Sequence, residues 1–385
     1  MAAYISIIFW GNWHHINQQG IFYNEYLAIA KHLLNGDGYV IHTGIPVLYP
    51  ICGYTLFTLI AEFTGSPLFV LALFQFFLCI ISISLFYKFF NLEKRYWHIL
   101  LFTPFIALLS VRWPDAIVGT LLIVTAYYIN RSFETSSKKD ALLGGLLLGI
   151  ILNFRSEYLG LLVFLMIIAI GSLLVRKKEL FYLLTLIVIP ASLILLPWAY
   201  YSYSLDKHIR LTATNGGGVL YISLGQLPEN PWGIVHSDSV AYAVSKQNGI
   251  DDPYSVKGDS LLTAKFIDDI DHNPIAFSEK VGYNLLASLI RGVYIGEYDG
   301  LVQIIVKVIF TIVFNLLLLF SCLYFLKHRI KRPVLLIVSV LIIYKYFLIS
   351  FIQYEPRHMN AIYLFMLGIS LLYLRERVHE KKTRK

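Results

Sequence analysis

The sequence predicts an all-α polytopic membrane protein of about nine to eleven membrane helices, with a mixed extracytoplasmic loop domain inserted. The first observation is composition: 57% of the 385 residues are hydrophobic, 15% are charged, and the mean hydropathy is +0.65. Soluble globular domains carry about 25% charged residues, so this chain is expected in a bilayer. The second observation is that apolar runs cover nearly the whole chain, apart from one long polar stretch. The third is that basic residues form short clusters between these runs.

Apolar runs that suggest membrane helices occur in both halves of the chain. A bilayer crossing needs about 20 mostly apolar residues. The run at 98–111 is short and contains Pro104, so it is expected to cross obliquely or to turn back in the bilayer where protein covers it. The other runs cover 67–89, 116–130, 140–152 joined to 158–175, 181–200, 301–326, 334–352 and 359–374.

The first apolar run, MAAYISIIFW, holds about half the residues that a bilayer crossing requires. It lacks the basic start and the small-residue cleavage site of a signal peptide. Two explanations stay open: the true start of the chain lies upstream, or this helix is tucked against others.

The basic clusters predict which loops are cytoplasmic, because Lys and Arg are enriched on that side of a membrane. This explains the net charge of +8 as a topology signal, so no nucleic-acid partner is expected. The opposite side then receives 12–66, the turns near 112–115 and 153–157, the segment 201–299 and the turn at 353–358. The clusters are Lys94 and Arg95, Arg131 with Lys138 and Lys139, Arg176 to Lys178, Lys327 to Arg332, and the tail from Arg375.

The chain therefore divides into four parts. Residues 1–200 form an N-terminal membrane domain, whose first external loop at 13–66 carries the candidate acid described next. Residues 201–299 form the extracytoplasmic loop domain, 300–374 the C-terminal membrane helices, and 375–385 a basic cytoplasmic tail. We expect the protein in the cell (inner or plasma) membrane, with any active site on the extracytoplasmic side.

An amphipathic helix is predicted in the first external loop. Glu25 lies at the border between its apolar and polar sides, where a carboxylate reaches a lipid head group. The helix is expected to lie on the membrane surface and to stop at the turn residues NGDGY. A structural interpretation stays open, in which Glu25 only favours the helix N-terminus. The apolar side is Tyr26, Ile29, Ala30, Leu33 and Leu34, and the polar side is Asn24, Lys31 and Asn35.

Other charged residues lie at the outer ends of predicted spans, where burying a charge costs free energy unless the charge is paired with an opposite charge or solvated by water. Arg112 and Asp115 form either a local ion pair with a helix cap, or an anion site at a helix start. Arg155 is a natural phosphate clamp through its bidentate donors, although a structural pair with Glu157 is the alternative.

The turn before the last span contains Glu355, Arg357 and His358. The basic pair suits a phosphate, and His358 titrates near neutral pH, whereas the alternative is an interfacial anchor. In the long loop, three glycines at 216–218 suit either an anion-binding nest or a tight turn into a short strand, VLYISLG. His14 and His15 lack partners at metal spacing, and the three scattered cysteines form no disulfide framework or metal motif.

The order of these features resembles the GT-C superfamily of polytopic glycosyltransferases, particularly bacterial relatives of protein O-mannosyltransferases and lipid A aminoarabinose transferases. The matching stretches are NEYLAIAKHLLNGDGY, YPICGYTLF, SPLFVLALFQ, WPDAIVGTLL, GGLLLGIILNFRSEYL and YEPRHMNAIYLF, within residues 22–375. Two departures stand out. Asn24 precedes Glu25 where the family usually carries Asp, and YPPGY has become YPICGY.

The resemblance implies an inverting transfer of a sugar from a polyprenyl-phosphate donor to a hydroxyl of a glycan, lipid or protein. Glu25 then inherits the role of base, and Asp115 orients the acceptor or the first-loop helix. Arg155 and Arg357, with Arg112 and His358 behind them, stabilise the leaving phosphate. The residues expected to bind substrate are Asn24, Tyr26, Tyr49, Tyr221 and Trp232, with Tyr254 as a further stacking surface.

No cofactor is required by the sequence, and a divalent metal has no support there. The competing class is a transporter or flippase for a lipid-linked or anionic solute, which intramembrane charges and broken helices would suit. Against it, no internal inverted repeat is visible, and the ionisable residues gather toward one surface. A non-catalytic membrane assembly factor is the third alternative.

Overall fold

A computed structural model describes residues 2–19, 24–41, 46–95, 98–111, 114–295, 300–328 and 333–383. Throughout these residues the regular structure is helical, and the one β-type pairing is an isolated bridge between Val40 and Pro46. The prediction of an α-helical chain is therefore confirmed. The expectation of a mixed loop domain is wrong, because its described residues contain helices and turns without a strand.

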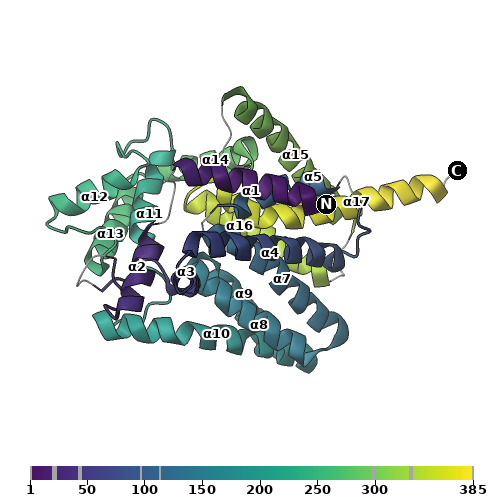
Figure 1. Ribbon diagram of the computed structural model, residues 1–385, viewed down its shortest axis with the longest axis horizontal. Coiled ribbons are helices and arrows are strands. Elements are labelled where there is room, and N and C mark those ends of the chain that lie inside the picture. Colours follow the sequence, from purple (N-terminus) through teal and green to yellow (C-terminus); the bar gives the residue numbers. More distant parts are fainter. Residues whose placement is uncertain are drawn as a thin grey trace.

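The helices follow one another with short connections (Figure 1). The first half of the chain contains α1 (Ala2–Gln19), α2 (Asn24–Asn35), α3 (Cys52–Glu62), α4 (Pro67–Phe89), α5 (His98–Leu101), α6 (Thr103–Leu109), α7 (Pro114–Thr135), α8 (Lys138–Phe154), η1 (Ser156–Tyr158), α9 (Leu159–Leu174) and α10 (Lys178–Asp206). The second half contains α11 (Gly216–Ser223), η2 (Leu224–Gln226), α12 (Asp238–Gln247), α13 (Val256–His272), α14 (Pro274–Arg291), α15 (Gly300–Lys327), α16 (Pro333–Phe351) and α17 (Pro356–Thr383).

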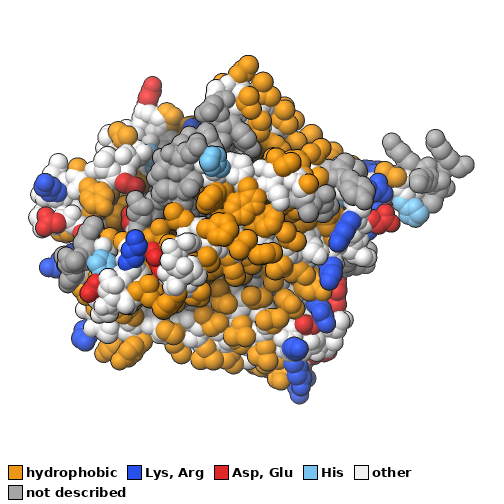
Figure 2. Space-filling model, viewed as in Figure 1, with side chains coloured by type: hydrophobic (Ala, Val, Ile, Leu, Met, Phe, Trp, Pro, Cys, Tyr) orange, Lys and Arg blue, Asp and Glu red, His pale blue; other side chains and the backbone are white. Residues whose placement is uncertain are grey.

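Five helical segments in the described part of the chain are long and apolar enough to cross a membrane: α4, α7, η1 with α9, α10 and α15. This is fewer than the nine to eleven expected, because α8 is short and charged at its start, and only Leu335–Phe351 of α16 is counted, as a shorter apolar helix. Figure 2 shows a broad apolar band across the middle of the molecule, with charged side chains toward both ends. These features indicate integration in a lipid bilayer.

The centre of the bundle is formed by α6, α7 and the first half of α17. All seven residues of α6 are buried, and so is almost every residue from 358 to 373. The short run around Pro104 is therefore covered by protein, and its path through the bilayer stays a prediction. The first helix, α1, also packs against α6, where Asn12 donates a hydrogen bond to the Ala107 carbonyl at 3.1 Å.

The α11–α13 domain lies at one end of the bundle, opposite the end where the chain termini are marked (Figure 1). Its small core includes Tyr221, Leu224 and Leu262. The predicted strand VLYISLG is instead helical in α11. The reason is the glycine run: a Cβ on Gly217 would lie 2.1 Å from the Asp259 carbonyl oxygen, so the missing side chain lets α11 pack directly against α13.

The predicted amphipathic helix is confirmed as α2, and its end falls at Gly36 and Gly38, both with positive φ. Its position on the membrane surface stays a prediction. The apolar side packs against protein, since Ile29 shares a buried cluster with Trp198 and the Tyr26 ring meets Tyr54 at 4.9 Å. This packing positions Glu25, which lies in the first turn of the helix.

Helices α7 and α8 form an antiparallel hairpin. At one end Asp115 contacts Arg155, and at the other Arg131 contacts Asp140. We call these the cavity end and the loop end of the hairpin. In Figure 2, Lys and Arg side chains line the edge of the molecule opposite the α11–α13 domain.

Candidate functional site

A cavity of about 850 Å³ lies between the membrane helices and the α11–α13 domain, and we call it the polar cavity. Its wall is built from the start of α2, the turn after α8, parts of α11 and α12, and the end of α16 with the start of α17. It brings together seven of the residues predicted from the sequence to take part in binding or catalysis, which are Glu25, Tyr26, Tyr49, Arg155, Tyr254, Arg357 and His358.

The cationic side of the polar cavity is anchored on Asp115. This residue is buried in the first turn of α7 and lies behind the cavity wall. Arg155 donates a hydrogen bond to its carboxylate, and the Nε atom of Arg357 lies 3.9 Å from the same Oδ2 atom. Because α8 ends at Arg155 in an extended conformation, the side chain turns back toward α7. One buried carboxylate thus orients two guanidinium groups that come from distant parts of the chain.

Asp115 belongs to the helix itself, so the capping interpretation does not describe it. The proposed partner Arg112 lies outside the described residues. Arg357 also pairs with Glu355 at 2.5 Å. A guanidinium carries five N–H donors in a planar fork, a geometry that matches the oxygens of a carboxylate or a phosphate.

A second ion pair forms the floor of the polar cavity. The ammonium of Lys345, in α16, lies 2.5 Å from a carboxylate oxygen of Glu157 and 5.0 Å from the centre of the Tyr158 ring. The Tyr344 hydroxyl donates to the Glu157 carbonyl. In place of the alternative Arg155–Glu157 pair, Arg155 pairs with Asp115 across the α7–α8 hairpin, and Glu157 pairs with Lys345 of α16, which is distant in the sequence.

Sequence reasoning missed Lys345, although a signal was present. It is a lysine inside the apolar run 334–352, only 2% exposed, and an ionisable residue inside a span marks a functional or structural site. The sequence does not indicate which residue pairs with Lys345, because Glu157 lies 188 residues away.

Glu25 lines the opposite side of the polar cavity. Burial raises the pKa of its carboxyl above the usual value, and the nearby Asp238 carboxylate raises it further. Asp238 begins α12 next to the N-cap Ser237, and it also lines the cavity. A carboxylate with a raised pKa accepts a proton more readily near neutral pH, which suits a general base.

Tyrosine rings form part of the wall near Glu25. Tyr49 and Tyr254 both line the polar cavity, with ring centres 4.9 Å apart, and Tyr242 meets Tyr254 edge-on at 5.7 Å. Burial, followed by the Asp238 carboxylate, raises the pKa of Tyr254, so its hydroxyl stays protonated. These rings offer an apolar face beside hydroxyl donors, a combination that suits a sugar ring.

Two predicted stacking residues do not line the cavity. Tyr221 is 9% exposed in the core of the α11–α13 domain, and Trp232 packs against that core while its Nε1 donates to the Asp269 carbonyl at 2.9 Å. Their apolar surface stabilises the small domain instead. The side chain of Asn24 lies outside the described residues.

Among the described side chains, no group of three or more His, Cys, Asp or Glu residues is arranged to hold a metal ion. Comparison with protein-family models, with curated proteins and with solved structures gives no match. The functional conclusion therefore depends on the polar cavity and on the sequence motifs that converge there.

Proposed function

We propose that the protein is an inverting glycosyltransferase that moves a sugar from a polyprenyl-phosphate donor to an acceptor hydroxyl on the extracytoplasmic side of the membrane. One observation carries the proposal: a carboxylate with a raised pKa, Glu25, shares a cavity with the paired arginines Arg155 and Arg357, at the ends of membrane helices. The order of motifs that resembles GT-C enzymes supports the same reaction.

In this mechanism the donor phosphate lies at the arginine side of the cavity and its lipid tail lies in the bilayer. The acceptor hydroxyl attacks C1 of the sugar while Glu25 takes the hydroxyl proton. The bond between C1 and the phosphate oxygen breaks, and its electron pair leaves with the phosphate. Arg155 and Arg357 stabilise the negative charge that grows on the phosphate, and His358 and Arg112 are secondary candidates for the same role. Attack opposite the leaving group inverts C1.

Other residues have supporting roles in this proposal. Asp115 holds the two arginines in place, as its contacts with both of them support. Tyr49 and Tyr254 stack on sugar, and Tyr26 fixes α2 against α3 next to the base. The acceptor is a glycan, a lipid or a protein, and no step requires a metal or other cofactor.

The alternative is a transporter or flippase for a lipid-linked or anionic solute. The observation that favours it is the Glu157–Lys345 pair, because buried charges within membrane helices often mark solute or proton paths. Glycosyl transfer requires a base beside the acceptor, whereas transport does not.

The test is transfer of labelled sugar from a synthetic polyprenyl-phosphate donor by the purified protein in liposomes. Wild type is compared with Glu25→Gln and with the matched control Glu134→Gln, an exposed glutamate near the end of α7. We expect the Glu25 variant to lose transfer while the control retains it and both keep the wild-type melting temperature. Undiminished transfer by Glu25→Gln contradicts the base assignment, and solute uptake without transfer by wild type favours the alternative.

A further inference from the structure

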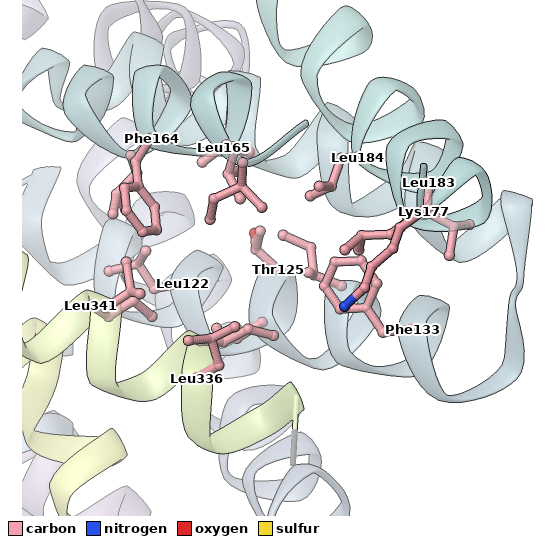
Figure 3. Close-up of a pocket in the computed structure, with 18 of the residues that line it drawn as sticks. Leu122, Thr125, Phe133, Phe164, Leu165, Lys177, Leu183, Leu184, Leu336 and Leu341 are labelled. Carbon is pink, nitrogen blue, oxygen red and sulfur yellow. The ribbon is translucent and has the colours of Figure 1, made fainter. Parts of the chain in front are cut away.

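A second cavity lies among the membrane helices and shares no lining residue with the polar cavity. This apolar cavity has a volume of about 530 Å³ and is lined by residues of α7, α8, α9, α10 and α16 (Figure 3). In Figure 3 the side chains of Leu122, Phe164 and Leu165 border the open space with other leucines. The volume falls within the range of about 300–1,000 Å³ that is usual for small-molecule sites.

The apolar cavity opens toward the surface of the bundle. Two residues of its wall, Phe164 and Leu336, are 38% and 48% exposed on helices whose apolar faces meet the bilayer. A hydrocarbon chain can therefore enter sideways from the membrane. An elongated apolar molecule fits this wall, because a polar solute would leave its hydrogen-bonding groups unpaired there.

One end of the apolar cavity is polar and carries a cation. Lys177 extends its ammonium group along the wall, as Figure 3 shows, and it forms no ion pair with the side chains that the structure describes. The neighbouring carboxylate of Glu179 is engaged, because Ser136 donates a hydrogen bond to it. Arg176 and Lys178 flank Lys177 in the sequence, so this end attracts an anionic group.

The position of this end distinguishes the ligand from the sugar donor. The polar cavity lies by Asp115 at the start of α7, whereas Ser136 follows the end of this 22-residue helix. At 1.5 Å per residue the two ends are roughly 30 Å apart, about the thickness of the hydrocarbon layer. A lipid with its head group at Lys177 therefore belongs to the leaflet opposite the polar cavity.

We propose that the apolar cavity binds one acyl chain of an anionic phospholipid, whose phosphate pairs with Lys177. The binding is independent of the proposed sugar transfer. The lipid fills the space between α7, α9 and α16. Asp115 and Lys345 lie on α7 and α16, and Glu157 lies just before α9, so the lipid contacts helices that also carry the ion pairs of the polar cavity.

The test is lipid retention by the full-length protein in detergent, measured by native mass spectrometry. The protein is equilibrated with phosphatidylglycerol and phosphatidylcholine that carry the same acyl chains. We expect wild type to retain the anionic lipid about five-fold in excess, the size expected for one cation at a membrane surface. Lys177→Gln should abolish the preference, whereas Lys257→Gln, a matched exposed lysine on α13, should keep it.

A second variant tests the cavity itself. Ile168→Trp adds an indole to the lining and should reduce retention of both lipids at an unchanged melting temperature. Equal retention of the two lipids by wild type overturns the proposal, and so does an unchanged preference in Lys177→Gln. Because no donor or acceptor is present, a failed transfer reaction does not affect this result.

Discussion

The two ends of the α7–α8 hairpin carry the same chemistry in different surroundings. At the loop end, Arg131 lies 3.1 Å from Asp140, and these side chains are 51% and 8% exposed. At the cavity end, Arg155 donates to Asp115, and these side chains are 24% and 7% exposed, so the two ends differ in the exposure of the arginine. The loop-end pair links two helix ends at the surface, since Asp140 lies in the first turn of α8, where Ser137 caps the helix.

The cavity-end pair belongs to a larger network. Arg357 approaches the same aspartate, the Glu157–Lys345 pair forms the neighbouring floor, and an 850 Å³ cavity opens beside them. An Arg–Asp pair is therefore insufficient evidence of a site. What distinguishes the cavity end is a second cation on the same carboxylate and a polar cavity beside it.

The largest effect is expected from Arg155→Gln. The variant removes a donor that would stabilise the leaving phosphate, so transfer should fall about 10²–10³-fold. The rate of labelled-sugar transfer measures this. Arg131→Gln serves as the control at the loop end, and a similar loss in both variants would remove the distinction between the two ends.

A large effect on stability is expected from Lys345→Met. The change leaves the Glu157 carboxylate without its buried partner, which costs about 3–5 kcal/mol of unfolding free energy. Thermal unfolding in detergent measures it. The double variant Glu157→Gln with Lys345→Met should recover much of the loss, because no unpaired charge then remains. A double variant as unstable as the single one would contradict this pairing.

The acidic side of the polar cavity predicts a pH effect. Glu25 acts as a base only when deprotonated, so transfer should fall as the pH decreases through its raised pKa. Asp238→Asn removes a like charge and lowers that pKa, which should extend transfer to lower pH. Initial rates over a pH series measure the shift. If the pH profile of transfer shifted toward higher pH in Asp238→Asn, the Asp238 carboxylate would not be raising the pKa of Glu25.

The smallest effect is expected at the loop end. Arg131→Gln should destabilise the protein less than Lys345→Met does, because the Arg131 side chain is 51% exposed and solvated by water, although its partner Asp140 is only 8% exposed. Its transfer rate should match that of wild type. Thermal unfolding and the transfer assay check both points, and a marked loss in either would give the loop end a role that its geometry does not indicate.

The sequence predicted individual charges better than it predicted partners. Glu25, Arg155 and Arg357 stood out because each interrupts or borders apolar sequence, and they line one cavity. Their pairing depends on how helices pack, so the contacts of Glu157 with Lys345 and of Arg357 with Asp115 were not readable from spacing.

Aromatic residues and glycines were less informative. Trp232 and Tyr221 are residue types that often stack on sugars, yet Tyr221 lies in the core of the α11–α13 domain and Trp232 packs against that core. Gly217 fitted a turn before a strand, whereas its use is the close contact of two helices. In each case the role of the residue depends on a neighbour that is distant in the sequence, and the amino-acid sequence alone does not identify that neighbour.

The central claim is that Arg155, at the cavity end of the α7–α8 hairpin, binds the phosphate of the sugar donor and that Arg131, at the loop end, does not. The most direct measurement is the affinity of purified wild type, Arg155→Gln and Arg131→Gln for a polyprenyl phosphate. We expect the Arg155 variant to bind at least about ten-fold more weakly, a loss of about 1.4 kcal/mol, and the Arg131 variant to bind like wild type. Equal affinities for all three proteins would contradict the claim.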